Sequence, residues 1–540
     1  MRTFHAYGVR AATLLALWGL FVIGSQTARA QARDAWQTRA RQQVRVARAR
    51  LARAAQAFGG VEALKELHSF SYTGQGQRLS ITQKVDPGGA ARGVSAYEQL
   101  VSVDLATGSL RQDITREISY PFAAVTDYTN LLKGQLGYVE GTNNILGAPE
   151  GPMDSARWAA IRKEHLLLNP YLIVRHALLH PEALLPRRSG FAVDVSALGA
   201  GERPVRMFLE RRSGRVVRAH VVENDHLLRD VPVDVYYASY QPVDGLTLPT
   251  AVSLEVDAEL VAHEERSEVA VNPVLDGDLF AFPDGPSPSY DPVAAERASD
   301  SHQWHQGFIV VGIPADQLQL DVVATELSEG VFHLTGGLHH SLVVEQQAGI
   351  VVAEAPLYPE RADALIAWIR GRFPTRPITH VIASHHHADH SGGLRSFVAE
   401  GATVVASRRA RSLYRRVFRA ESSVSPDRLA SEPTRARIRS VAPAGVVGLD
   451  DPLRPVHVHH IESGHATDMV VVSLPQQGMV FQADIYSPGF PLNLELAIEL
   501  RDQIVSLGLD ATRMPAGHGA VGSFAELEAA IDAAIAADTQ

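Results

Sequence analysis

The spacing of hydrophobic and polar residues changes along the chain. From Arg33 to Phe58, apolar residues recur at helical spacing before Gly59-Gly60, which predicts an amphipathic helix. Between about Ser69 and Pro283, short runs alternate between apolar and polar residues, and turn residues separate the runs. This alternation predicts an antiparallel sheet, interrupted by one helical stretch over roughly Met153 to Leu179.

The carboxy-terminal part of the chain shows a different pattern, in which apolar strands alternate with amphipathic helices. The predicted strands are Val331–Thr335, Ser341–Gln347, Ile350–Glu354, Ile378–Ala383, Thr403–Ala406, Met469–Leu474 and Met479–Gln482. The predicted helices are Glu360–Phe373, Arg408–Arg419, Leu492–Leu507 and a last helix that opens with the capping box Ser523 to Glu526. This order predicts helices packed on a sheet, and therefore an α/β domain.

A chain of 540 residues is too long for one compact core. The proline-rich stretch from Asp284 to Pro292 lacks apolar periodicity and predicts a linker at residues 285–310. Residues 31–284 then form a mainly antiparallel β (α+β) domain, and residues 311–540 form the α/β domain. The strand order of the first domain resembles the half-barrel of periplasmic lipoprotein-carrier-like domains.

The amino terminus has the pattern of a secretory signal. Arg2 and Arg10 precede the apolar run Ala11 to Ile23, and Ala28-Arg29-Ala30 offers a cleavage site, so residues 1–30 are predicted to be removed. A membrane anchor is the alternative, but the run is shorter than the ~20 apolar residues of a spanning helix. We therefore expect an exported protein, periplasmic or secreted, with no integral membrane segment after cleavage.

The amino-acid composition excludes several kinds of chemistry and of partner. Cysteine is absent, which excludes disulfides, thiol nucleophiles and thiolate metal ligands. The net charge of -10 and the lack of a basic domain argue against a nucleic-acid partner. The basic face of the helix at residues 33–58 could rest on anionic lipid, although a solvated helix surface is the commoner explanation.

Histidine and aspartate residues cluster where a predicted strand ends. His385, His387, Asp389 and His390 lie between the strand at Ile378–Ala383 and a glycine-bearing turn. Neutral imidazoles and carboxylates are the ligands that zinc and similar divalent cations accept. A solvated surface cluster is the alternative, but further residues of the same types follow at later strand ends and glycine turns, namely His465, Asp484 and His518.

These residues, in this order, resemble the His-x-His-x-Asp-His, His, Asp, His signature of the metallo-β-lactamase superfamily over roughly residues 325–525. The resemblance implies an αββα sandwich with a metal groove at one sheet edge. It also implies that one metal is held by His385, His387 and His465, that the second is held by Asp389, His390 and His518, and that Asp484 bridges the two. Ala483 departs from the family pattern, which usually has glycine before the bridging aspartate.

The expected cofactors are two Zn2+ ions, with iron or manganese left open. Two cations about 3.5–4 Å apart can share a hydroxide, since coordination lowers the pKa of water toward ~7. The nucleophile is then this hydroxide, which Asp389 orients while it ligates.

Other polar residues lie near the motif without matching a ligand position of the signature. Tyr486 could donate a hydrogen bond to an oxyanion, against the commoner role of a packed aromatic. His340, with His339, lies in a turn that the resemblance places at the groove, where it could contact substrate. We expect His386 to point away from the metals, and the following histidines to occupy ordinary strand positions: His457, His459 and His460.

The leading hypothesis is an exported, metal-dependent hydrolase of a small-molecule ester, thioester, lactone or related acyl compound. The resemblance supports it, because a bridging aspartate marks the thioesterase, lactonase and phosphodiesterase branches, whereas β-lactamases usually have another residue there. The alternatives are a β-lactamase, redox chemistry at iron as in sulfur dioxygenases, and an apolar-ligand binding protein with a non-catalytic metal domain. The sequence leaves substrate and oligomeric state open.

Overall fold

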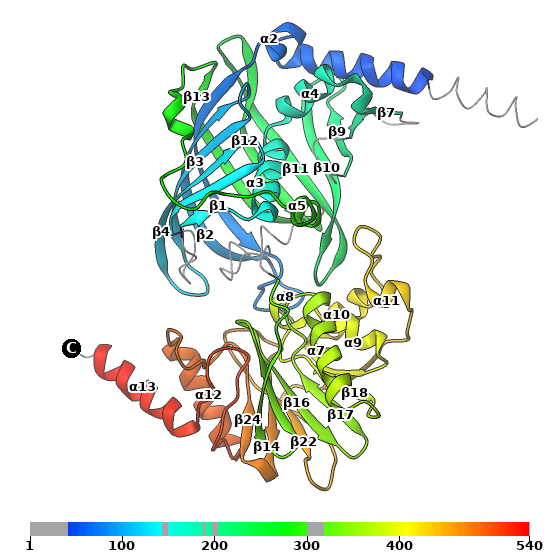
Figure 1. The fold of residues 1–540 in the computed structure, drawn as a ribbon, viewed down its shortest axis with the longest axis vertical. Coiled ribbons are helices and arrows are strands. Elements are labelled where there is room, and N and C mark those ends of the chain that lie inside the picture. The colour runs from blue at the N-terminus through cyan, green and yellow to red at the C-terminus, as the bar shows by residue number, and fades with distance from the viewer. Residues whose placement is uncertain (1–40, 143–149, 187–190, 197–202, 300–317, 539–540) are drawn as a thin grey trace, which may run out of the picture.

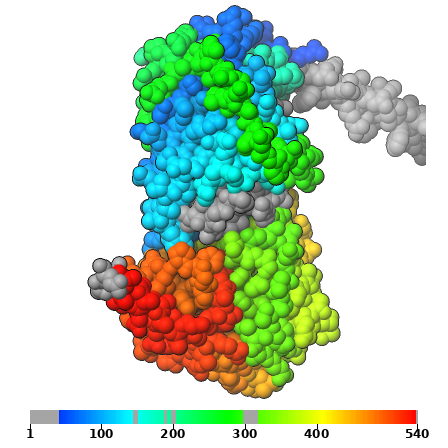
Figure 2. All heavy atoms as spheres, turned by 60° about the vertical axis from the view of Figure 1, so that its left-hand side comes forward, coloured from blue at the N-terminus to red at the C-terminus, as the bar shows by residue number. Residues whose placement is uncertain are grey.

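The computed structural model describes residues 41–142, 150–186, 191–196, 203–299 and 318–538. A sheet-rich amino-terminal domain lies above a carboxy-terminal domain in Figure 1, and Figure 2 shows the two packed directly against each other. The predicted signal peptide at residues 1–30 lies outside the described residues. Within the described ranges, no helix combines the length and apolar content needed to cross a membrane.

The amino-terminal domain is a single antiparallel sheet of 13 strands in the order β6-β5-β4-β3-β2-β1-β13-β12-β11-β10-β9-β8-β7. The strands are β1 Ser69–Ser80, β2 Arg92–Asp104, β3 Ser109–Ile118, β4 Ala124–Lys133, β5 Leu136–Gly141, β6 Gly151–Pro152, β7 Leu184–Leu185, β8 Ala192–Val195, β9 Val205–Leu209, β10 Val216–Asp225, β11 Arg229–Val243, β12 Leu246–Val256 and β13 Glu259–Val271. The predicted antiparallel sheet is therefore confirmed.

Helices fill the concave face of this sheet. The predicted helical interruption consists of α3 Ser155–Leu168 and α4 Pro170–Leu179, which lie inside the curve of the sheet (Figure 1). Their apolar residues join the sheet and the helix at residues 41–57 in one buried cluster that includes Phe58, Phe70, Ile173 and Val233. The domain also has a short helix, α2 Val61–Lys65, and a 3-10 turn, η1 Pro181–Ala183.

Part of the predicted linker is helical. After the turn η2 Gly277–Phe280, helix α5 Pro292–Ser299 packs against α3. The backbone N–H of Asp291 donates to Ser155 Oγ at 2.8 Å, and the Tyr290 ring meets Trp158 edge to face at 5.6 Å. This segment is therefore attached to the amino-terminal domain, and residues 300–317 are outside the description.

The carboxy-terminal domain has two sheets. The first, in the order β14 to β20, contains β14 Val323–Ser328, β15 Val331–Thr335, β16 Ser341–Gln346, β17 Gly349–Ala353, β18 Ile378–Ile382, β19 Thr403–Ser407 and β20 Arg437–Val441. The second contains β21 Val446–Leu449, β22 Val456–His460, β23 Val470–Leu474 and β24 Met479–Phe481. Strands β17 to β20 pair in parallel and the other pairs are antiparallel.

An apolar layer joins the inner faces of the two sheets, with Leu342 and Val351 from the first and Val458 and Phe481 from the second. Helices cover the outer faces. On the first sheet they are α7 Pro359–Arg372, α9 Leu394–Ala399, η3 Arg408–Ala410, α10 Arg411–Val417 and α11 Arg428–Ser431, while Ala388 of the short helix α8 Ala388–Ser391 joins the buried cluster of the amino-terminal domain. On the second they are α12 Leu494–Ser506 and α13 Phe524–Asp538, while the 3-10 turn η4 Pro475–Gln477 connects β23 to β24. The predicted αββα sandwich is confirmed.

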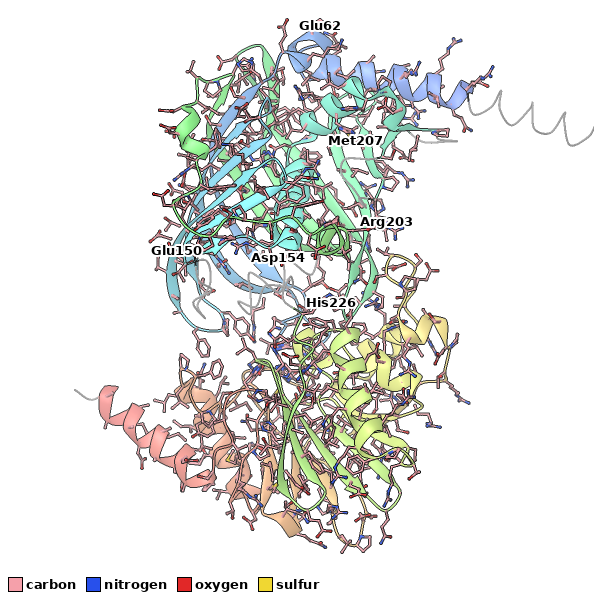
Figure 3. All side chains as sticks on the ribbon, in the orientation of Figure 1. Glu62, Glu150, Asp154, Arg203, Met207 and His226 are labelled. Carbon is pink, nitrogen blue, oxygen red and sulfur yellow. The ribbon has the colours of Figure 1, made fainter. Side chains whose placement is uncertain are left out.

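The β10–β11 hairpin fixes one edge of the domain junction. At its tip, His226 faces the carboxy-terminal domain (Figure 3), and its ring meets Tyr358 at 5.4 Å. Arg229 is fully buried and lies with Arg395 around the carboxylate of Asp427, which Arg229 Nε approaches to 3.5 Å. Burial alone would raise the pKa of Asp427, but the hydrogen bond from Arg395 and the two guanidinium charges lower it overall.

Replacing Asp427 by alanine should destabilise the protein, because two buried guanidinium groups lose their shared counter-ion. We expect the free energy of unfolding to fall by about 3–5 kcal/mol, measured by urea denaturation. Asp502→Ala is the control, since Asp502 pairs with Arg501 and its side chain is 62% exposed. Equal stability of Asp427→Ala and the wild type would show that the buried cluster does not stabilise the junction.

Candidate metal centre

The predicted metal ligands come from loops at one edge of the sandwich. His385 and His387 follow β18, and Asp389 and His390 belong to α8. The remaining predicted ligands lie between β22 and β23, directly after β24, and between α12 and α13: His465, Asp484 and His518. The fold brings all of them together in two groups of candidate metal-binding side chains.

The first group consists of His385, His387, His465 and Asp484. His465 Nε2 lies 3.3 Å from His385 Nε2 and 3.1 Å from His387 Nδ1. Asp484 Oδ2 lies 3.1 Å from His465 Nε2 and 3.4 Å from His385 Nε2. Three imidazole nitrogens and a carboxylate oxygen thus face one point, as in a tetrahedral site for a divalent cation.

The second group contains His339, Asp389, His390 and His518. His518 Nε2 and His390 Nε2 are 3.3 Å apart, and Asp389 Oδ2 lies 3.4 Å from His390 Nε2. The sequence predicted a possible substrate contact for His339, not a place among the metal ligands. Its Nε2 lies 3.3 Å from Asp389 Oδ2, and its ring is buried.

Asp484 connects the two groups. Its Oδ2 faces the first group, while its Oδ1 lies 2.9 Å from the Nε2 atoms of both His390 and His518. Oδ1 is buried and has no hydrogen-bond partner of acceptable geometry among the described residues. Asp484 also has a φ of 64°, a backbone conformation that is uncommon outside glycine. A carboxylate held this way is suited to bridge two cations.

The departure at Ala483 is accommodated by its neighbour. A side chain at Gly517 would place its Cβ 3.0 Å from the Ala483 methyl group. Because Gly517 has no side chain, the methyl group fits and the strand end keeps its place.

The second nitrogen of most of these imidazoles has a partner. His385 Nδ1 lies 2.8 Å from Ser384 Oγ, His518 Nδ1 donates to Leu338 O at 2.6 Å, and His390 Nδ1 contacts Glu354. Such contacts fix the ring orientation and leave the other nitrogen's lone pair free for a metal. The donor set therefore fits divalent cations.

In the metal-free protein, the pKa values of predicted histidine ligands shift in opposite directions. Burial and the nearby His390 lower the pKa of His385 to about 4, and burial lowers the pKa of His387 well below its usual value. Burial would also lower the pKa of His390, but Asp484, Asp389 and Glu354 raise it well above its usual value. Burial would raise the pKa of Asp484, which the His390 and His518 charges instead hold well below its usual range.

The amino-terminal domain reaches this centre through the segment that joins β1 to β2. Gln83 Nε2 donates to Asp389 Oδ1 at 2.6 Å, and His387 Nε2 donates to the backbone carbonyl of Lys84 at 2.8 Å. The Lys84 carbonyl thus directs His387 Nδ1 toward the first group. Nothing in the sequence pattern marked these residues, because they belong to another domain and their segment has no metal-ligand spacing.

A cavity of about 360 Å³ opens beside the two groups. It is lined by Asp389, His465, Asp484 and His518, and also by amino-terminal residues, which are Gln83, Arg92, Ser119, Tyr120, Pro121 and Phe122. Its size lies within the range of small-molecule sites, ≈ 300–1,000 Å³. The candidate site is therefore built by both domains.

Several histidines and Tyr486 lie outside this cavity. Tyr486 is buried in the apolar cluster beneath α12 and α13, and burial together with Glu526 raises its pKa. His340 Nε2 donates to Gly337 O at 3.0 Å, whereas His339 lines the cavity. His386 is buried against Asp468 at 2.7 Å, and β22 contains the other three: His457, His459 and His460.

A family model matches the part of the chain that contains the seven predicted metal ligands. The family model described as the Metallo-beta-lactamase superfamily matches residues 360–537. Among solved structures, a metallo-beta-lactamase from Pontibacter korlensis is 20% identical over 39% of this chain and 98% of its own, with a TM-score of 0.31. The DIM-1 metallo-beta-lactamase is 19% identical over 40% of this chain and 98% of its own, also at 0.31. No curated protein matches.

The clustered histidines and aspartates at the edge of this sandwich define a metal-dependent hydrolase. Its carboxy-terminal domain belongs to the metallo-β-lactamase superfamily.

Zinc binding to the metal-free protein at pH 7 should release a proton from His390. The raised pKa keeps this imidazole protonated, and the cation replaces the proton on Nε2, whereas His385 and His387 are already neutral. Titration calorimetry in PIPES and in HEPES, which bind zinc weakly and differ in ionisation enthalpy, measures the release. The Glu354→Gln variant should release fewer protons on zinc binding, because the substitution removes one of the charges that raise the pKa of His390. Equal heats in both buffers would contradict this assignment.

Proposed function

We propose that the protein is an exported two-zinc hydrolase of an ester, thioester, lactone or similar acyl compound. The observation that carries this proposal is the Asp484 carboxylate, which faces one imidazole group with Oδ2 and the other with Oδ1. The resemblance stated above associates an aspartate at this position with acyl and phosphate ester hydrolysis. We also propose the domain division made from the sequence: a signal peptide at 1–30, a β domain at 31–284, a linker at 285–310 and the catalytic domain at 311–540.

In this proposal, His385, His387 and His465 hold the first cation, Asp389, His390 and His518 hold the second, and Asp484 touches both. Two divalent cations, when bound, supply a water of lowered pKa and polarise the acyl oxygen. Hydrolysis adds the water oxygen to the acyl carbon, breaks the bond to the leaving group and returns a proton to that group. The fold's part is to hold these donors at fixed positions.

The chain itself orients Asp389 from two sides. Gln83 Nε2 contacts Oδ1 at 2.6 Å, and His339 Nε2 lies 3.3 Å from Oδ2. Burial and nearby His518 lower the pKa of His339 to about 3, so its imidazole is neutral at pH 7. Burial alone would raise the pKa of Asp389, but nearby His390 and the contacts of His339 and His390 hold it well below its usual value, so it stays a carboxylate that can ligate the second cation and orient a water by accepting its hydrogen bond. His339 is also close enough to serve as a further ligand of the second cation.

The arrangement favours catalysis over carriage of an apolar ligand by the amino-terminal sheet. Helices α3 and α4 and their buried side chains fill the concave face where such a ligand would lie. The cavity at the junction, in contrast, adjoins the ligand residues directly.

Purified mature protein should contain near two zinc ions per chain by elemental analysis. It should hydrolyse members of a panel of aryl esters, thioesters and lactones, tested with a chromogenic cephalosporin and a phosphodiester, and chelation should abolish turnover. Turnover of the cephalosporin alone would move the assignment to a β-lactamase. Absent metal and absent turnover after zinc is supplied would overturn the proposal.

Asp484→Ala and His387→Ala should abolish hydrolysis, because each removes a cation ligand. The loss should exceed the 10–100-fold that is typical when only a partner of a ligand is removed. The matched control is His457→Ala, on β22 and outside both candidate groups, which should keep its activity. Circular dichroism should show the amino-terminal sheet intact in all three variants. Full activity of both ligand variants would contradict the two-metal assignment.

A further inference from the structure

Arg92 is a cationic residue of the amino-terminal domain that lines the cavity beside the candidate metal ligands. It is the first residue of β2, where the segment that carries Gln83 returns to the sheet. Its guanidinium lies over the Tyr120 ring at 4.3 Å, and Nη2 donates to the backbone carbonyl of His465 at 2.9 Å. A ring face and a carbonyl thus hold the guanidinium in one position next to a metal-ligand loop.

The charge of Arg92 has no counter-ion in the part of the chain that the structure describes. Neither Asp389 nor Asp484 pairs with it, since their carboxylates contact the histidines. Glu495 lines the same cavity from α12 but does not form an ion pair with Arg92 either. A half-buried guanidinium loses part of its hydration. Without a carboxylate partner, no ion pair offsets this desolvation cost unless a ligand supplies the anion.

The rest of the cavity is largely apolar. Phe122 comes from the amino-terminal domain, while Leu338, Phe490 and Leu496 come from the carboxy-terminal domain. These walls fit a hydrocarbon segment, and they leave Arg92 as the one cationic side chain other than histidine among the residues described around this cavity. A substrate with an apolar chain and one anionic group would match this distribution.

We infer that Arg92 binds a carboxylate on the substrate and thereby selects anionic acyl compounds. The inference rests on the proposed hydrolase function and adds the chemical class of its substrate. A guanidinium presents several N–H donors in a planar fork that matches a carboxylate, and a neutral carbonyl would not require this charge. Tyr120 and the His465 carbonyl restrict the side chain, which lowers the entropy cost of binding. Because Arg92 belongs to the other domain, substrate selection depends on the amino-terminal domain.

The test compares esters that differ only in charge. Mono-4-nitrophenyl esters of glutaric and adipic acid are paired with their methyl esters, and the zinc-loaded protein is assayed with the rate without protein subtracted. We expect kcat/KM for the charged ester to exceed that for its neutral partner at least tenfold. Arg92→Gln should reduce this ratio to near one, and Arg92→Lys should restore part of it, because lysine keeps the charge without the fork.

The matched control is Arg212→Gln, which removes an exposed arginine of the amino-terminal domain outside the cavity and should leave the ratio unchanged. If Arg92 only supported the His465 loop, Arg92→Gln would slow both esters equally and the ratio would persist. That result, or a wild-type ratio near one, would overturn the inference.

A binding measurement separates this inference from the proposed function. Glutarate and its monomethyl ester are titrated into the zinc-loaded protein by calorimetry, which needs no turnover. Tighter binding of glutarate in the wild type, lost in Arg92→Gln and kept in Arg212→Gln, would support the anion site even if no ester were hydrolysed. Hydrolysis of neutral esters with no glutarate binding would instead uphold the hydrolase and overturn the anion site.

Discussion

The candidate site depends on a single carboxylate, that of Asp484, which is held between two groups of imidazoles. In the first group, His465 Nε2 lies 3.1–3.3 Å from a ring nitrogen of His387 and of His385, and the lone pairs of neutral imidazoles placed this way cannot all be satisfied by hydrogen bonds within the group. The Asp484 oxygens face both groups from a backbone conformation with φ 64°, which the surrounding strand ends must enforce. A bound cation would resolve this conflict, since it accepts lone pairs from imidazole and carboxylate groups that face one point.

The positions of the predicted ligands also depend on the junction between the two domains. His387 takes its orientation from the Lys84 carbonyl, and Asp389 is contacted by Gln83, so two predicted ligands depend on backbone and side-chain groups of the other domain. These contacts can hold the two ligands in place only if the domains keep a fixed orientation relative to each other. The buried Arg229 and Asp427 supply a second point of attachment at the far hairpin, and two separated attachments oppose rotation about either one.

The sequence was sufficient to predict most elements of the sandwich, but not β14, β20 or β21, and to predict the seven ligand residues that converge at its edge. Strand β15 has the predicted bounds, and the predicted helix at Arg408–Arg419 divides into η3 and α10. Local periodicity and ligand spacing are properties of short segments, and therefore they can be seen in one sequence. The contacts of Gln83 with Asp389 and of Arg92 with His465 could not be seen, because they join segments more than 300 residues apart through a domain interface.

The division of chemistry between the domains also has an electrostatic consequence. The carboxy-terminal domain contributes the carboxylates of the centre, Asp389, Asp484 and Glu354, whereas the amino-terminal groups that reach it are an amide, a carbonyl and a guanidinium. With the two divalent cations of the proposed function bound, their charge would exceed that of these three carboxylates, and Arg92 would add to the excess. The cavity would then be positive inside a protein whose net charge is -10. Since low-dielectric walls focus such a field, an anion would be drawn to this cavity in preference to the surface around it.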